Sequence, residues 1–324
     1  MDVLRTPDDR FEALHEYPFE PHYAEVSDPD GGALRMHYVD EGPRDAPPVL
    51  MFHGNPEWSY GFRRLISRLA AEGFRAIAPD MIGFGRSDKP VERREHSIAR
   101  HVGWLRELVQ RLDLREITLI CQDWGGTMGP GVVALEEQRF ARILISNGIM
   151  HTAEAELAGR LPRGYSVHTL NEHEMCIGTD MLAWLARSQR MEGLTASQAA
   201  HGLCTEPVSE DVAAGYDAPF PDERHMVALR QFAMLIPLRL EDEGAVHNRE
   251  TWKRLSSFRK PVLTVYGDAD PTTGGWDAIY QERIPGARGQ PHVVLEGAGH
   301  FLAEDRPEEL AERALGFIRQ SQAT

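Results

Sequence analysis

The sequence has little cysteine, and its cysteines and histidines show no spacing typical of a structural metal site. It contains three cysteines, Cys121, Cys176 and Cys204, and no two of them form a CxxC pair. An odd number of widely spaced cysteines argues against a disulfide framework and against a cysteine-ligated zinc site. The 14 histidines include no HExxH motif, which argues against the common helical zinc-protease site. We therefore predict no metal site.

The sequence also lacks long apolar runs and an excess of basic residues. The first nine residues contain no apolar signal region, and no apolar stretch approaches the ~20 residues that span a membrane. Lysine and arginine total 35 against 50 aspartate and glutamate residues, so the net charge is −15. This charge disfavours binding to nucleic acid or to an anionic membrane surface. We expect a cytoplasmic protein, a monomer or weak homo-oligomer, that acts on a small molecule.

Buried strand patterns and helical patterns alternate along most of the chain. The 324 residues are 42% hydrophobic, which suits one large domain with a sizeable core. This alternation predicts an α/β fold with a mostly parallel central sheet and helices on both faces. Strands are predicted at residues 33–39, 47–52, 75–79, 117–121, 141–146, 261–266 and 292–295, and helices at 59–71, 98–112, 127–137, 248–258, 276–283 and 306–320.

The alternation stops between residues 151 and 230, where no buried strand pattern is present. Short helical stretches in this region are separated by glycines and prolines, as expected of an insertion between core strands. We therefore predict a core made of residues 1–150 and 231–324, with an inserted helical cap at 151–230. Residues before about Tyr23 are expected to form an irregular arm.

The segment 119–126 has the pattern of a nucleophile elbow. An apolar run ends at Gln122 and Asp123, and Gly125 and Gly126 follow before a helical stretch. Strand, sharp turn and helix expose one side chain at the turn, and small residues allow the two backbones to approach. Because the residue at the apex is Asp123, the sequence favours attack by a carboxylate and formation of an ester on the enzyme. The alternative is an aspartate that only caps the following helix.

Two late strands are followed by an acid and a base. Asp268 and Asp270 follow the strand 261–266, and His300 follows the strand 292–295. Functional groups collect at the carboxyl ends of parallel strands, and Asp123, Asp270 and His300 stand in the order nucleophile, acid, base. Each residue alone could be a turn residue. Together they predict a catalytic triad.

These motifs resemble those of the haloalkane dehalogenases of the α/β-hydrolase superfamily. The likeness is strongest to the subfamily whose triad acid follows the late strand, and it covers nearly the whole chain. The resemblance implies an α/β-hydrolase fold with an inserted helical cap. The motif at 83–90 is shared with epoxide hydrolases, whereas the run at 122–126 is more specific. The matching segments are residues 5–11, 53–60, 83–90, 122–126 and 216–222.

The resemblance also implies roles for individual residues. Asp123 is expected to be the nucleophile, His300 the base and Asp270 its carboxylate partner. The backbone N–H groups of Asn55 and Trp124 are expected to form an oxyanion hole. Two indole N–H groups, from Trp124 and from Trp184 in the cap, are expected to bind the departing halide. Expected pocket residues are Thr127, Met181, Phe220, Phe232, Thr272 and Phe301.

The implied reaction converts a small halogenated alkane into an alcohol, a halide ion and a proton, and needs no cofactor. Two residues depart from the subfamily pattern. Asn55 stands where glutamate or glutamine is usual, so its side chain could add a donor to the halide. Glu57 stands where threonine is usual and is expected to point to solvent, because glutamate is rarely buried unpaired. If Thr272 and Thr273 line the tunnel, substrates with a polar tail could be accepted.

Two alternatives remain open from the sequence. An epoxide hydrolase would use the same aspartate but needs acidic donors in the cap, for which Tyr165 and Tyr216 are available. A non-catalytic binding protein of the same fold predicts a damaged triad, whereas this one is intact. A serine esterase is disfavoured because no serine occupies the elbow.

Overall fold

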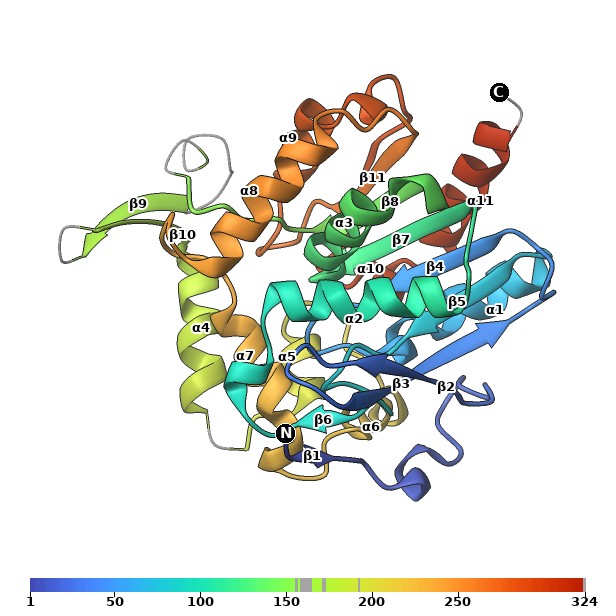
Figure 1. Cartoon of the computed structure of the whole chain (residues 1–324), viewed down its shortest axis with the longest axis horizontal. Helices are drawn as coiled ribbons and strands as arrows, with labels where there is room; N and C mark the ends of the chain where they lie inside the picture. The colour runs from blue at the N-terminus through green and yellow to red at the C-terminus, as the bar shows by residue number, and fades with distance from the viewer. Residues whose placement is uncertain (155–156, 158–164, 171–172, 192, 323–324) are drawn as a thin grey trace.

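An eight-stranded sheet forms the centre of the molecule (Figure 1). The computed structural model describes residues 1–154, 157, 165–170, 173–191 and 193–322. The strand order is β12-β11-β8-β7-β4-β5-β3-β2. Neighbouring strands from β12 to β5 are parallel, whereas β3 pairs antiparallel with both β5 and β2. The strands are β2 (His22–Ser27), β3 (Ala33–Glu41), β4 (Pro48–Phe52), β5 (Arg75–Pro79), β7 (Ile117–Asp123), β8 (Phe140–Gly148), β11 (Val262–Gly267) and β12 (Val293–Leu295).

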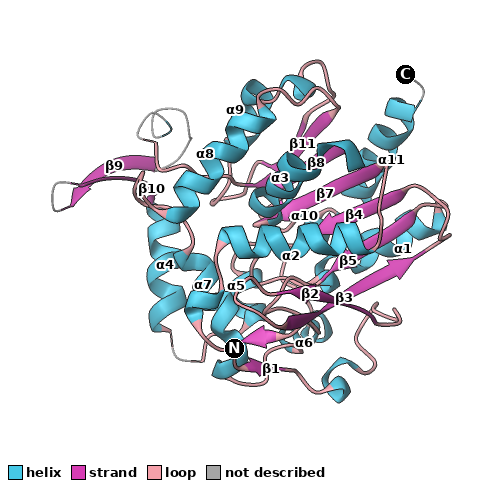
Figure 2. Cartoon of the chain, in the orientation of Figure 1, coloured by secondary structure: helices cyan, strands magenta, loops and turns pink. Residues whose placement is uncertain are grey.

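The central strands are apolar along their length because helices cover both faces of the sheet (Figure 2). Every residue of β4 and of β11 is buried, as expected of strands without a solvent-facing side. Helices α1 and α11 contact one another and pack on one face, whereas α2, α3, α8 and α9 pack together on the other. These helices are α1 (Arg63–Ala71), α2 (Ile98–Arg111), α3 (Gly125–Glu136), α8 (Glu243–Leu255), α9 (Trp276–Arg283) and α11 (Pro307–Gln322).

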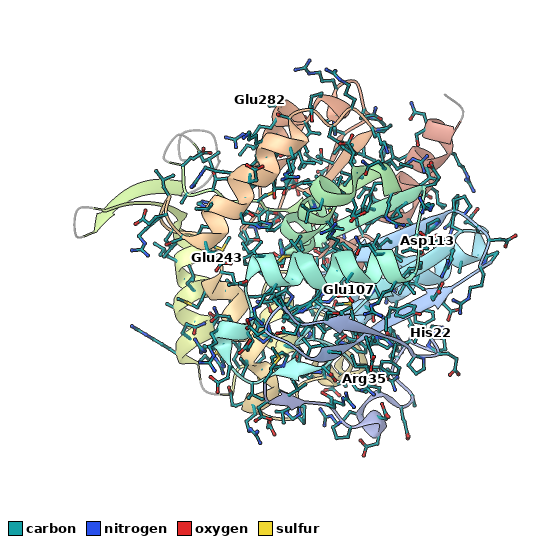
Figure 3. The ribbon with its side chains drawn as sticks, in the orientation of Figure 1. His22, Arg35, Glu107, Asp113, Glu243 and Glu282 are labelled. Carbon is teal, nitrogen blue, oxygen red and sulfur yellow. The ribbon has the colours of Figure 1, made fainter. Side chains whose placement is uncertain are left out.

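Polar contacts fix helix α2 to the sheet. Glu107 on α2 accepts hydrogen bonds from the backbone N–H of Ser27, at 2.8 Å, and from its hydroxyl, at 3.0 Å, and so ties α2 to β2 (Figure 3). In the described part of the chain, no helix is both long and apolar enough to cross a membrane. The order of the strands and the helices on both faces of the sheet confirm the predicted α/β architecture.

The segment between β8 and α8 contains helices and also a β-hairpin. The helices are α4 (Thr179–Arg190), α5 (Ala196–His201), α6 (Glu210–Asp217) and α7 (Val227–Met234). Strands β9 (Tyr165–Leu170) and β10 (His173–Gly178) pair antiparallel and project beside α4 (Figure 1). The expectation of a cap without strands is wrong here. Val167, Thr169 and Ile177 are β-branched and favour strands, but the longest apolar run in the hairpin strands is Met175, Cys176 and Ile177.

Four smaller departures occur in the core and the arm. Strand β2 was not predicted, and only its first two residues overlap the arm expected up to about Tyr23. The predicted helix at 59–71 begins as a 3-10 turn, Ser59–Phe62, before α1. The arm contains β1 (Val3–Leu4), which pairs with β6 (Lys89–Pro90). A short helix, α10 (Leu302–Asp305), precedes α11.

Candidate active site

Asp123 lies at a strained turn between β7 and α3. Its φ is 50°, in the left-handed region that L-residues other than glycine rarely adopt. The turn is tight because Gly125 and Gly126 bring α3 against neighbouring backbone. A Cβ on Gly125 would lie 2.1 Å from the carbonyl oxygen of Phe52, and a Cβ on Gly126 would lie 2.5 Å from the Cα of Gly148. The local sequence therefore forces the Asp123 side chain out of the turn.

The structure brings the three predicted triad residues within hydrogen-bond distance. His300 Nε2 lies 3.2 Å from Asp123 Oδ2, and His300 Nδ1 lies 2.9 Å from Asp270 Oδ2. Burial disfavours a charged ring, but the carboxylates of Asp270 and Asp123 outweigh it and hold the pKa of His300 well above its usual value. In the resting protein the imidazolium therefore donates a hydrogen bond to each carboxylate.

Hydroxyl groups after β11 hold Asp270 in place. Thr272 Oγ1 donates to Asp270 Oδ1 at 2.7 Å and lies 3.0 Å from His300 Nδ1, and the hydroxyl of Thr273 donates to Asp270 Oδ2. Burial alone would raise the pKa of Asp270, but the charge and hydrogen bond of His300, with the Thr273 hydroxyl, lower it to about 2. Asp270 therefore stays ionised beside the ring.

The base is held through its backbone as well as its ring. Gln122 Nε2 and Asn147 Nδ2 donate to the carbonyl oxygen of His300 at 2.6 and 2.7 Å. The backbone N–H of His300 donates to the carbonyl oxygen of Leu203, in the cap, at 2.8 Å. Sequence reasoning missed these supports, although the polar Gln122 and Asn147, each at the end of an apolar strand, were a usable signal.

Asn55 contacts the candidate nucleophile through its backbone. Its N–H donates to Asp123 Oδ1 at 2.8 Å, whereas its side-chain Nδ2 donates to the carbonyl oxygen of Leu229 at 3.0 Å. The Asn55 Oδ1 is buried and has no partner among the described residues. A flipped amide would place two acceptors against each other at Leu229. The side-chain amide is therefore engaged with α7, which weakens the idea that it binds a halide.

A cavity of about 310 Å³ opens over Asp123 between the core and the cap. Trp124 and Trp184 both line it, and within the described residues neither indole N–H donates a hydrogen bond. An indole N–H is a donor with no acceptor function, so the two groups suit an anion. The lining residues are Asn55, Pro56, Asp123, Trp124, Ile149, Met181, Ala183, Trp184, Arg187, Ala199, Gly202, Leu203, Ile236, Pro271, Thr272 and His300.

Four residues expected on the cavity wall lie behind it. The hydroxyl of Thr127 donates to the carbonyl oxygen of Ile149, so this side chain supports the elbow. Phe232 packs edge-on against Trp124, with ring centres 5.4 Å apart, and Phe301 packs in the same way against His300 at 4.7 Å. Phe220 packs edge-on against Phe84, with ring centres 6.3 Å apart. Phe232 and Phe301 therefore support groups that line the cavity, whereas Phe220 packs on Phe84, which is not among the lining residues. Met181 and Thr272 line it, as expected.

Glu57 is buried, and the expectation that it points to solvent is wrong. Only 1% of its surface is exposed, and its Oε2 accepts a long hydrogen bond from Gly54 N at 3.4 Å. Gly54 separates it from Asp123, since a Cβ on Gly54 would lie 2.2 Å from Asp123 Oδ1. Burial, reinforced by the charge of Asp123, raises the pKa of Glu57 to about 8. A neutral carboxyl group therefore lies behind the loop that contacts the nucleophile.

Among the described residues, no three histidine, cysteine or acidic side chains are placed to hold a metal ion.

Residues 47–172 match a family model described as the α/β hydrolase fold. The chain is 41% identical to a haloalkane dehalogenase of Psychrobacter cryohalolentis over 321 residues, which is 99% of each chain.

Two further relatives extend the match. A haloalkane dehalogenase of Mycobacterium marinum is 41% identical over 98% of this chain and 100% of its own length. The solved tetrameric haloalkane dehalogenase DpaA of Paraglaciecola agarilytica superposes with a TM-score of 0.84 at 28% identity, covering 98% of each chain. With this identity over almost the whole length, on a matching fold, the chain belongs to the haloalkane dehalogenase family of the α/β-hydrolase superfamily.

Proposed function

We propose that the protein hydrolyses carbon–halogen bonds in haloalkanes through an ester on Asp123. One observation carries the proposal: the Asp123 carboxylate, held by Asn55 N–H and His300, opens into a cavity that also contains two indole N–H groups with no hydrogen-bond partner among the described residues. A carboxylate can displace a leaving group from saturated carbon. The indoles of Trp124 and Trp184 offer donors to the halide as its charge develops.

In the first step, Asp123 attacks the carbon that bears the halogen. The new C–O bond forms as the carbon–halogen bond breaks, and the halide leaves with the bonding electrons. No proton moves in this step, so the base is not needed. A cavity that excludes bulk water favours the reaction because fixed donors replace the hydration of the carboxylate.

In the second step, His300 takes a proton from water, and the oxygen of that water attacks the carbonyl carbon of the ester. The resting His300 is held charged by two carboxylates. Alkylation of Asp123 removes one of these charges, so the pKa of His300 falls and the ring can act as a base. Asn55 N–H is placed to stabilise the oxyanion, and Asp270 stabilises the imidazolium. Alcohol, halide and a proton are released.

The geometry gives less support to an epoxide hydrolase. That reaction needs a donor in the cavity that protonates the epoxide oxygen. The hydroxyl of Tyr216 is instead donated to Glu304 Oε2 at 3.1 Å, and Tyr216 is not among the cavity-lining residues. The side chain of Tyr165, the other candidate donor, lies outside the described part of the structure.

Replacement of His300 separates the two steps. The His300→Phe protein is expected to release about one halide per molecule from 1-bromohexane and then stop, because displacement needs no base but ester hydrolysis does. The protein should gain the mass of one hexyl group, on the peptide that contains Asp123. Intact-protein mass spectrometry and halide release measure both quantities.

The control is Asp123→Ala in the same background, for which neither halide release nor a mass gain is expected. A folded His300→Phe protein that is not alkylated, beside an active wild type, would contradict the separation of steps. Equal alkylation of the Asp123→Ala control would exclude Asp123 as the nucleophile. Diol formation from an epoxide without halide release from the bromoalkane would favour the epoxide hydrolase.

A further inference from the structure

One face of α4 forms a wall of the cavity from its interior to its rim. Met181, Trp184 and Arg187 follow one another at intervals of three residues and all line the cavity, as expected for side chains on one helical face. Their exposure rises in the same order: Met181 is buried, Trp184 is half-buried and Arg187 is exposed. With a rise of about 1.5 Å per residue, Arg187 lies roughly 9 Å along the helix axis from Met181.

The guanidinium of Arg187 has no partner in the described part of the chain. It forms no ion pair and donates no hydrogen bond to any described residue. Its Nη1 would lie 3.9 Å from a Cβ built on Gly202, a small residue that lines the cavity together with Ala199. The charged group therefore extends across the rim from α4 toward the end of α5, where small residues leave space beside it.

The other polar donors of the wall are engaged or belong to the reaction, and the unpartnered Asn55 Oδ1 is an acceptor. The Thr272 hydroxyl is donated to Asp270, and the Asn55 amide is donated to Leu229. Among the described lining residues, Asp123 is the only acid, and it belongs to the reacting centre. Arg187 thus supplies a positive charge at the opening of an otherwise largely apolar cavity.

We propose that Arg187 forms a subsite for an anionic tail, so that the enzyme accepts haloalkanes that carry a terminal carboxylate. This inference rests on the proposed function, because the halogenated carbon must reach Asp123 while the tail remains at the rim. An alkyl chain would cross the apolar middle of the cavity, and its carboxylate would meet the guanidinium in the two-point geometry that arginine favours. The tail stays at the mouth, where it is partly hydrated and need not be fully desolvated.

The test compares 6-bromohexanoate with 1-bromohexane. Both contain the same halogenated chain, and only the first carries a negative tail. The Arg187→Met protein keeps an apolar stem of similar reach but loses the charge. Its kcat/KM for 6-bromohexanoate is expected to fall about fivefold, the equivalent of an ion pair worth about 1 kcal/mol. The kcat/KM for 1-bromohexane is expected to change less than twofold.

Arg190→Met is the matched control. Arg190 lies on the same helix and has the same charge, but it lines a separate hollow together with Arg93 and Gln189. An equal loss in both variants would assign the effect to net charge and overturn the subsite. Hexanoate adds a binding measurement, because it should inhibit turnover of 1-bromohexane in the wild type and inhibit the Arg187→Met protein less.

The outcomes separate this inference from the proposed function. The Arg187→Met protein could turn over 1-bromohexane and keep the wild-type ratio of kcat/KM for the two substrates. That result would reject the subsite and leave the proposed reaction standing. Failure of the wild type to release bromide from either compound would instead reject the proposed reaction. A selective loss of 6-bromohexanoate turnover and of hexanoate inhibition supports the subsite.

Discussion

The burial of Glu57 near Asp123 lowers the stability of the folded protein by an amount that depends on pH. In the unfolded chain the Glu57 carboxyl group is expected to have an ordinary pKa, near 4.5, whereas the folded structure raises that pKa to about 8. The folded state therefore binds more protons than the unfolded state between these values. Stability falls as pH rises through this interval, because folding must keep a proton on Glu57 that the unfolded chain would release.

Glu57→Gln should remove this pH-dependent penalty. Glutamine keeps an oxygen that can accept the Gly54 N–H but does not ionise. The free energy of unfolding of the variant, relative to wild type, should increase by roughly 3 kcal/mol between pH 5 and pH 7.5, at about 1.4 kcal/mol per pH unit. Urea unfolding at the two pH values measures the change.

The exposed Glu12 offers a control for the general effect of removing an acid. Glu12→Gln should show no comparable change with pH, because that side chain lies in solvent. A stability difference between Glu57→Gln and wild type that stays the same at both pH values would show that Glu57 titrates in the folded state as it does in the unfolded chain.

At the scale of the element, the turn between β7 and α3 has no room for a larger residue at Gly125. A Cβ there would lie 2.1 Å from the carbonyl oxygen of Phe52 and 3.1 Å from that of His53. Both atoms are backbone, so neither can rotate away. Gly125→Ala should therefore destabilise the protein by about 2–3 kcal/mol, the usual range for overpacking, and should lower activity because Asp123 would shift.

Gly103→Ala is the same substitution in a helix with free space. A Cβ on Gly103, in α2, meets nothing within 4 Å, and alanine favours a helix over glycine by about 1 kcal/mol. This variant should be slightly more stable than wild type with unchanged activity. Denaturant unfolding measures the two free energies of unfolding. Equal values for Gly125→Ala and Gly103→Ala would contradict the close packing at the elbow.

The elements themselves were largely predictable where an apolar run or a helical period was strong. The predicted bounds of β5 and α9 agree with the structure because each is flanked by turn residues. The hairpin β9–β10 was not predictable from an apolar run, because its strands mix polar and apolar residues. Strand β2 was missed because only one of its six residues is fully buried.

The side chains of the site were predictable only in part. Strand ends indicate that Asp123, Asp270 and His300 meet, because parallel strands place them at one edge. The burial of Glu57 depends on contacts with Gly54 and Gly61 that a local pattern does not contain. The Oε1 of Glu57 would lie 2.5 Å from a Cβ on Gly61, so a larger residue there would displace the carboxyl group from its present position.

At the scale of the whole molecule, the cap and the base are connected. The backbone N–H of Thr205 donates to Asp305 Oδ2 at 3.0 Å, and the N–H of Gly299 donates to the same atom at 2.7 Å. Asp305 thus joins a cap segment to the loop that carries His300. The nucleophile, by contrast, is held by β7 and by Asn55 in the core.

Asp305→Ala should therefore slow ester hydrolysis more than displacement. Removing the carboxylate frees both N–H groups and loosens the loop of His300, while the contacts of Asp123 remain. We expect an initial burst of halide followed by a steady rate several-fold below that of wild type. Rapid-quench measurement of halide checks this, and a uniform decrease without a burst would show that both steps depend equally on Asp305.

The hydrogen bond from His300 to the carbonyl oxygen of Leu203 has a consequence for warm, substrate-exposed protein. If the cap loosens only around Leu203 while the wall at Trp184 stays in place, the enzyme would still load its nucleophile but would discharge it slowly. The lost activity would then reflect enzyme held as the alkyl ester on Asp123, and not unfolded protein. Cooling would let the cap close, water would release the trapped alcohol, and activity would return without any refolding of the core.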